Sequence, residues 1–173
     1  LQKQLKEFLE KTGMPFISTQ MGKGAMDENS PLYIGTTALS GGEYVHQALH
    51  SADTIILVGH DVIEKPPIIL TPESSKNCKI IHINFFPSYA KDIYIPTHEI
   101  IGDISHILSE FTKKIKVSSN WDFTYFFKVR DILRKDRIKF TNSQEFPLRP
   151  ERIIADAQKA LETGGVLALD NGM

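Results

Sequence analysis

The sequence predicts an α/β fold in which a doubly wound, mostly parallel sheet carries helices on both faces, over about residues 1–115. Segments with strand-like apolar runs alternate along the chain with segments whose apolar residues recur at helical spacing. The two strongest strand segments, 53–59 and 79–84, are almost continuously apolar, which is typical of strands buried on both faces of a parallel sheet. Parallel strands need crossover connections, and right-handed crossovers cover the sheet with helices.

The first half of this domain begins with a helix, because Leu1, Leu5, Phe8 and Leu9 fall at helical spacing and Gly13 is a good C-terminal stop. Glycine and proline then punctuate a loop between strands. The predicted elements are a helix over 1–11, a short strand over 15–19, a loop over 21–33, a helix over 42–51 and the strand over 53–59.

The second half contains the strand over 79–84 and a predicted edge strand over 92–95. Asp103 is suited to cap the helix that follows, because its carboxylate can accept a hydrogen bond from the first helical turn. The apolar face of that helix consists of Ile104, Ile107, Leu108 and Phe111.

Beyond residue 115 we expect a linker over 116–147, with a helix from Asn120 or Asp122 to Arg137. Residues 148–173 are predicted to be a truncated βα unit: a helix over 148–162, Gly164-Gly165, and an apolar strand over 166–169. In open α/β sheets ligands bind at the carboxyl ends of strands, so Asp170, Asn171 and Gly172 stand where a site would be built. We expect the chain to be a fragment of a larger parent protein, with both ends produced by cuts.

The amino-acid composition is that of an ordinary globular protein segment. With 41% hydrophobic residues, 24% charged residues and a formal net charge of −1, the chain has no bulk attraction to nucleic acid. No apolar run approaches the roughly 20 residues needed to span a bilayer, so we expect no membrane partner. The single cysteine, Cys78, excludes an internal disulfide and fits a reducing compartment. These observations predict a cytoplasmic location.

An ordered series of segments carries a family resemblance. A Pro-led strand and a Gly-Lys-Gly loop within residues 15–35 precede an Ala-Asp-led strand over 52–59 and a third strand over 80–84. In this order they resemble the central domain of the thiamine-diphosphate-dependent enzymes, whose members include acetolactate synthase and related decarboxylase-like large subunits. Residues 148–173 are similar to the start of the family's pyrophosphate-binding domain, and Asp170-Asn-Gly-Met173 most resembles the acetolactate synthase branch.

The resemblance implies a parent enzyme, a lyase or transferase that decarboxylates and joins 2-oxo acids with thiamine diphosphate and Mg²⁺. It also implies a homo-oligomeric parent, a dimer or a tetramer. Family members hold the cofactor between a pyrimidine-binding domain, which supplies an activating glutamate, and a pyrophosphate-binding domain with a Gly-Asp-Gly to Asn-Asn metal motif. The 173 residues contain no Gly-Asp-Gly. We therefore expect the fragment to be inactive, with no catalytic residue, metal ligand or bound cofactor of its own.

The resemblance also implies a dinucleotide pocket, since the family's central domain can bind FAD in loops that match Gly35, Thr36, Gly59, His60 and Asn84. Flavin-binding synthases usually carry an arginine two residues after an alanine in the position of Gly59-His60-Asp61, and an aspartate in place of Asn84. Because such an aspartate can bond ribose hydroxyls, we expect a vestigial pocket without FAD. The alternative is a stand-alone nucleotide-binding α/β domain, although such a module has no reason to carry residues 148–173.

Other local signals have structural interpretations. Gly22-Lys23-Gly24 lacks the spacing of a phosphate loop, and the pair His46 and His50 has no third metal ligand beside it. Cys78 is interpreted as a packing residue. The aromatic run from Trp121 to Phe127 marks either an interface or an anchor of the linker helix. We expect it to anchor the helix in the fragment, with part of that face covered by other domains in the parent.

Overall fold

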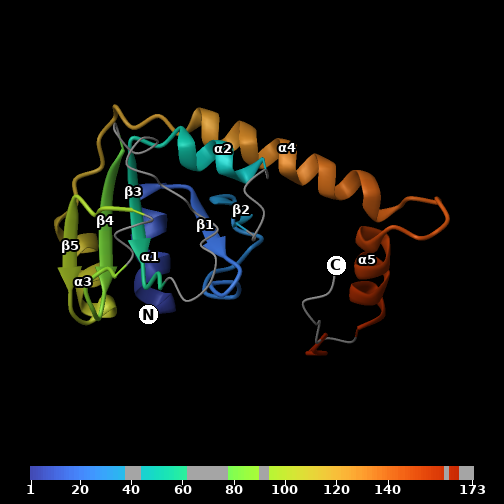
Figure 1. The fold of residues 1–173 in the computed structure, drawn as a ribbon, viewed down its shortest axis with the longest axis horizontal. Coiled ribbons are helices and arrows are strands. Elements are labelled where there is room, and N and C mark those ends of the chain that lie inside the picture. The colour runs from blue at the N-terminus through green and yellow to red at the C-terminus, as the bar shows by residue number, and fades with distance from the viewer. Residues whose placement is uncertain (38–43, 62–77, 90–93, 162–163, 168–173) are drawn as a thin grey trace. The chain divides into compact units, whose positions relative to one another are not determined.

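The computed structural model describes residues 1–37, 44–61, 78–89, 94–161 and 164–167 (Figure 1). The chain divides into two compact units, Leu1–Arg130 and Asp131–Met173, and each is described by itself. The domain boundaries predicted at residues 115 and 147 remain predictions.

All strand pairs described in the first unit are parallel. β1 (Phe16–Thr19) pairs with β2 (Tyr33–Thr37) in one sheet, and β3 (Thr54–Val58), β4 (Lys79–Asn84) and β5 (His98–Ile101) form a second sheet in that order (Figure 1). The prediction of an α/β fold with parallel strands is therefore confirmed. The sequence did not indicate β2, since only Tyr33 and Ile34 of its five residues are large and apolar.

The edge strand is not where the sequence placed it. Residues 92–93 lie outside the described residues, and Tyr94 and Ile95 are not in a strand; the edge is β5 instead. Pro96 explains the difference, because proline has no N–H to donate to a neighbouring strand. Pairing begins directly after it, where the Thr97 N–H donates to the Ile80 carbonyl over 2.7 Å.

Three helices accompany these strands: α1 (Gln2–Thr12), α2 (Val45–His50) and α3 (Ile104–Lys114). The predicted stop of α1 is confirmed, since Gly13 has a φ of 66° and its N–H donates to the Leu9 carbonyl. The predicted cap of α3 is confirmed as well, because the Asp103 carboxylate accepts from the His106 N–H over 2.7 Å. Of the helix predicted over 42–51, residues 42–43 lie outside the described residues.

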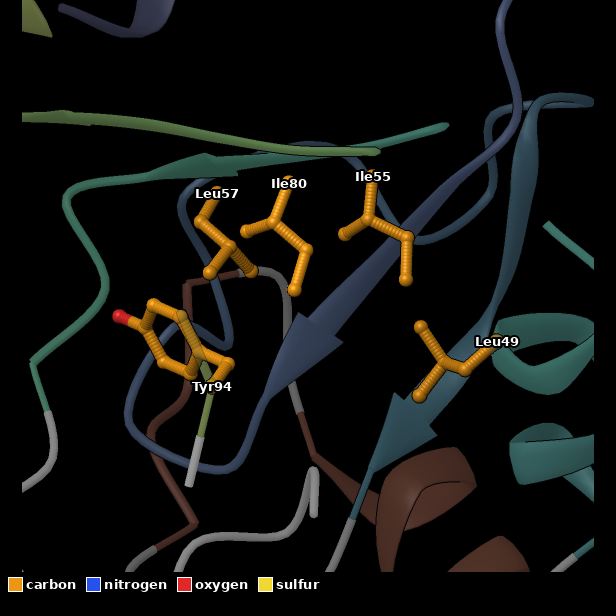
Figure 2. Close-up of a cluster of buried hydrophobic side chains, with 5 residues drawn as sticks. All are labelled: Leu49, Ile55, Leu57, Ile80 and Tyr94. Atoms are coloured by element: carbon orange, nitrogen blue, oxygen red, sulfur yellow. The ribbon is translucent and has the colours of Figure 1, made fainter. Parts of the chain in front are cut away.

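The core lies on both sides of β3 and β4. Side chains alternate across a strand, so Ile55 and Leu57 enter one cluster while Ile56 and Val58 pack against another. The first core consists of Leu49, Ile55, Leu57, Ile80 and Tyr94 (Figure 2). The second core consists of Phe8, Leu9, Ile83, Ile104 and Leu108. Since α2 supplies Leu49 and the helices α1 and α3 supply most of the second core, both faces of this sheet are covered.

α4 (Thr124–Thr141) crosses the division between the units, and α5 (Pro150–Ala160) lies in the second unit. α4 begins where the Asp122 carboxylate accepts from the Thr124 N–H, and it ends four residues later than predicted. α5 confirms the predicted helix with shorter bounds, and none of its residues is buried. No described helix is long and apolar enough to cross a membrane.

The prediction of a strand over 166–169 is wrong for residues 166–167, which the structure describes. Val166 and Leu167 are in no strand and are exposed, and residues 168–169 lie outside the described part of the chain. An apolar run becomes a strand only where a neighbouring strand satisfies its backbone hydrogen bonds, and the two described residues are paired with none.

Two isoleucine-to-alanine substitutions, one at a buried position and one at an exposed position, test the placement of the core. Ile83→Ala, at a side chain with 0% exposure, should lower the free energy of unfolding by about 2–5 kcal/mol, because it leaves a cavity in the second core. Ile101→Ala, at a side chain with 44% exposure, should cost about 1 kcal/mol or less. Urea unfolding followed by circular dichroism measures both. Equal losses at the two positions would contradict this placement of the core.

Candidate functional site

The structure brings three of the sequence-predicted site residues together at the carboxyl ends of β3 and β4: Gly59, His60 and Asn84. Gly59 ends β3 with a φ of +62°, and its N–H donates to the Ile83 carbonyl over 2.9 Å. That φ favours glycine, because a Cβ strains the left-handed conformation. The chain can therefore turn sharply after β3 and remain bound to β4.

Asn84 bridges the two strand ends. Its side chain is buried, its Nδ2 donates to the His60 carbonyl over 3.0 Å, and its Oδ1 accepts from the Phe85 N–H over 2.8 Å. A carbonyl only accepts and a backbone N–H only donates, so these partners determine the orientation of the amide. Both ends of the Asn84 amide thus form hydrogen bonds within the protein. Flavin-binding relatives are expected to carry an aspartate that bonds ribose at this position.

Two histidines and a tyrosine lie beside this bridge. The His60 ring meets the Tyr94 ring edge to face, with centroids 6.0 Å apart, and the His82 and Tyr94 centroids are 6.3 Å apart. His82 is buried; its Nε2 lies 3.2 Å from the Phe86 carbonyl and its Nδ1 lies 3.4 Å from the Tyr94 hydroxyl. Since a carbonyl only accepts, Nε2 of His82 carries a proton.

Burial governs the protonation of this cluster. The pKa of His60 is lowered from 6.5, first by desolvation and then by the neighbouring His82, while Asp61 raises it in part. Burial also raises the pKa of Tyr94, against a hydrogen bond with Ser88 that lowers it. Near neutral pH the cluster therefore favours a neutral imidazole at His60 and a neutral phenol at Tyr94.

Gly35 and Thr36 lie elsewhere, on β2, rather than in the loop expected from the resemblance. The Thr36 hydroxyl lies 2.6 Å from the Tyr33 hydroxyl and 3.3 Å from that of Ser18. The contact with Ser18 joins β2 to β1, whereas Tyr33 lies on β2 with Thr36. The assignment of Gly35, Thr36, Gly59, His60 and Asn84 to a dinucleotide pocket stays a prediction, and Asp170, Asn171 and Gly172 lie outside the described residues.

Sequence reasoning did not identify the roles of His82 and Tyr94. His82 lies within the strand predicted over 79–84, and Tyr94 lies within the edge strand predicted over 92–95. Tyr94 contacts His82, 12 residues before it, and His60, which is farther away along the chain. The available signal in the sequence was a histidine among the isoleucines of the strand Lys79–Asn84.

The described residues contain no group of three His, Cys, Asp or Glu side chains that could hold a metal ion. The Cys78 thiol is half-buried, and burial together with the nearby Asp53 raises its pKa, so the reactive thiolate is disfavoured there.

Comparison with known proteins matches residues 1–111 to the family described as thiamine pyrophosphate enzyme, central domain. Among curated relatives, the mitochondrial acetolactate synthase of Schizosaccharomyces pombe is 26% identical over 169 residues, covering 90% of this chain and 25% of the relative. A probable acetolactate synthase large subunit of Methanococcus aeolicus is 24% identical, covering 92% of this chain and 28% of the relative. The chain thus spans about a quarter of the length of these relatives.

A solved structure shares the fold. It is described as a putative thiamin diphosphate-dependent enzyme from Mycobacterium smegmatis, and it aligns with a TM-score of 0.56 at 22% identity. The alignment covers 69% of this chain and 23% of that one.

The Asn84 bridge can be tested by one substitution. Asn84→Asp should lower the free energy of unfolding by about 1–3 kcal/mol near neutral pH, because a carboxylate cannot donate to the His60 carbonyl. Facing that carbonyl, the new carboxyl has its pKa raised, so the loss relative to wild type is fully present above that pKa and shrinks as the pH falls through it. Denaturant titrations across pH measure the difference. Asn120→Asp, at an exposed position, is the control and should change stability by at most about 0.5 kcal/mol.

Proposed function

The chain belongs to the thiamine pyrophosphate enzyme family, whose central domain its residues 1–111 match, and we propose that it is the central domain of an acetolactate synthase-like enzyme. In this proposal the whole protein decarboxylates one 2-oxo acid and joins the product to a second. The match over residues 1–111 is the observation that carries the proposal. The predominance of acetolactate synthases among the relatives favours this branch of the family.

The role of the domain in this proposal is structural. Thiamine diphosphate and Mg²⁺ would supply the carbanion chemistry in the whole enzyme, held by other segments of the protein together with the edge formed by Asp170, Asn171 and Gly172. We further infer that the two described sheets belong to one doubly wound sheet. A domain with apolar cores on both sides of β3 and β4 suits the task of joining others, because close-packed cores deform little.

The bonds of Asn84 support a central domain without a bound dinucleotide. Its amide would have to leave both the His60 carbonyl and the Phe85 N–H before it could bond a ribose. Each buried group left unpaired costs about 1–3 kcal/mol. This is also the reason why a stand-alone nucleotide-binding domain is the weaker proposal.

Activity of the complete protein tests the proposed function. Expressed from its whole reading frame, it should form acetolactate from pyruvate only when thiamine diphosphate and Mg²⁺ are present. The 173-residue chain, assayed beside it, should neither turn over pyruvate nor bind thiamine diphosphate with Mg²⁺ in calorimetric titration. Saturable, Mg²⁺-dependent binding by the 173-residue chain would contradict the structural role, and a complete protein inactive on 2-oxo acids would contradict the proposed reaction.

Flavin content is a separate test. The 173-residue chain purified from cells should show no flavin absorbance band after gel filtration, since Asn84 is engaged within the protein. A stoichiometric flavin band would overturn the interpretation of a vestigial pocket.

A further inference from the structure

The His60 imidazole is a half-buried titratable group with no part in the proposed function. Within the described residues its Nδ1 is buried and has no hydrogen-bond partner. A neutral imidazole tolerates such a position if that nitrogen lacks a proton, whereas an imidazolium carries protons on both nitrogens and needs two acceptors. The position therefore discriminates between the two protonation states of the ring by geometry.

Among the described residues, a small set of contacts holds the segment that carries this ring. The Gly59 N–H is bound to the Ile83 carbonyl and the His60 carbonyl to the Asn84 amide, while the ring itself lies against Tyr94. Gly59 precedes the ring with a φ of +62°, and a glycine can leave that conformation for many others without a steric barrier from a side chain. No side chain at Gly59 therefore opposes a change of backbone conformation when residues 59–61 leave the strand end.

We propose that the contact between His60 and Tyr94 is a pH-sensitive latch at the carboxyl end of β3. With the imidazole neutral, the ring holds residues 59–61 against the end of β4. Protonation draws the ring into water, where both nitrogens find acceptors. Residues 59–61 then leave the end of β4 together, which breaks the bond from the Gly59 N–H to the Ile83 carbonyl and the bond from the Asn84 amide to the His60 carbonyl. The remainder of the sheet stays folded, because the cores on the two sides of β3 and β4 do not include His60.

The groups around His60 favour its neutral form in the closed state. Desolvation is the largest cause of the lowered pKa of His60, and the nearby His82 on β4 lowers it further. The charge of the neighbouring Asp61 raises the pKa of His60 in part. Glu99 on β5 acts on Tyr94 and accepts from the Ser88 N–H over 2.7 Å. Because the pKa in the closed state is lowered, closure is fully favoured above the ordinary value of 6.5 and weakens as the pH falls through it.

Hydrogen exchange on the whole 173-residue chain tests the latch. Exchange rates of the Gly59 amide, corrected for the intrinsic effect of pH, would be compared by NMR at about pH 7.5 and about pH 5.5, with Ile81 in β4 as the internal reference. The opening of Gly59 should rise by up to about tenfold, the limit for a ring that regains a pKa of 6.5 when open. Ile81 should show no such rise. An equal rise at Ile81 would mean general unfolding and would overturn the proposal.

Matched variants isolate the ring. His60→Phe keeps an aromatic group against Tyr94 without titrating, and it should abolish the pH dependence at Gly59. His106→Phe, at an exposed histidine of α3, should leave that dependence unchanged. A measurement on the wild type needs no variant: the titration midpoint of the His60 ring should coincide with the midpoint of the change in Gly59 exchange. Separate midpoints, or a pH response retained in His60→Phe, would overturn the latch.

Discussion

The pairing of β3 with β4 is the interaction on which the described site and both cores depend. The pair contributes Ile55, Leu57 and Ile80 to one core and Ile83 to the other, so neither face of the pair is solvated. Burying each such side chain contributes roughly 1.5–3 kcal/mol, and the parallel register places Ile55 beside Ile80 and Val58 beside Ile83. Parallel strands buried on both faces also place their carboxyl ends at the same edge, where polar residues can meet.

The polar residues at that edge depend on this register. Asn84 reaches the His60 carbonyl because β3 ends beside β4 and Gly59 then turns the chain. His82 points to the same side of β4 as Ile80, which brings its ring to Tyr94 at the margin of the first core. The polar groups of this cluster form their hydrogen bonds largely with one another. The pKa values of its titratable groups consequently depend on how the cluster is packed.

This arrangement agrees with the structural role that we propose for the domain. The residues matched to the central domain form helices and parallel strands around two apolar cores, while their polar groups at the strand ends bond mainly to one another. In the proposed enzyme such a domain would keep its neighbours in place. The second unit, in contrast, contains a helix, α5, without a buried residue, so little internal packing stabilises it.

Sequence by itself determined the elements with strong local signals. Apolar runs identified β3 and β4, helical spacing with Gly13 and Asp103 identified the bounds of α1 and α3, and an ordered series of motifs identified the family. Tertiary structure decided what local patterns could not: that β2 pairs with β1, that the edge strand follows Pro96, and that Val166 and Leu167 join no strand. It also decided that Asn84 bonds to the His60 carbonyl while Thr36 bonds within β1 and β2. The physical reason is that caps and helical faces involve residues within four positions of each other, whereas strand pairing and buried polar bonds join residues far apart in the chain.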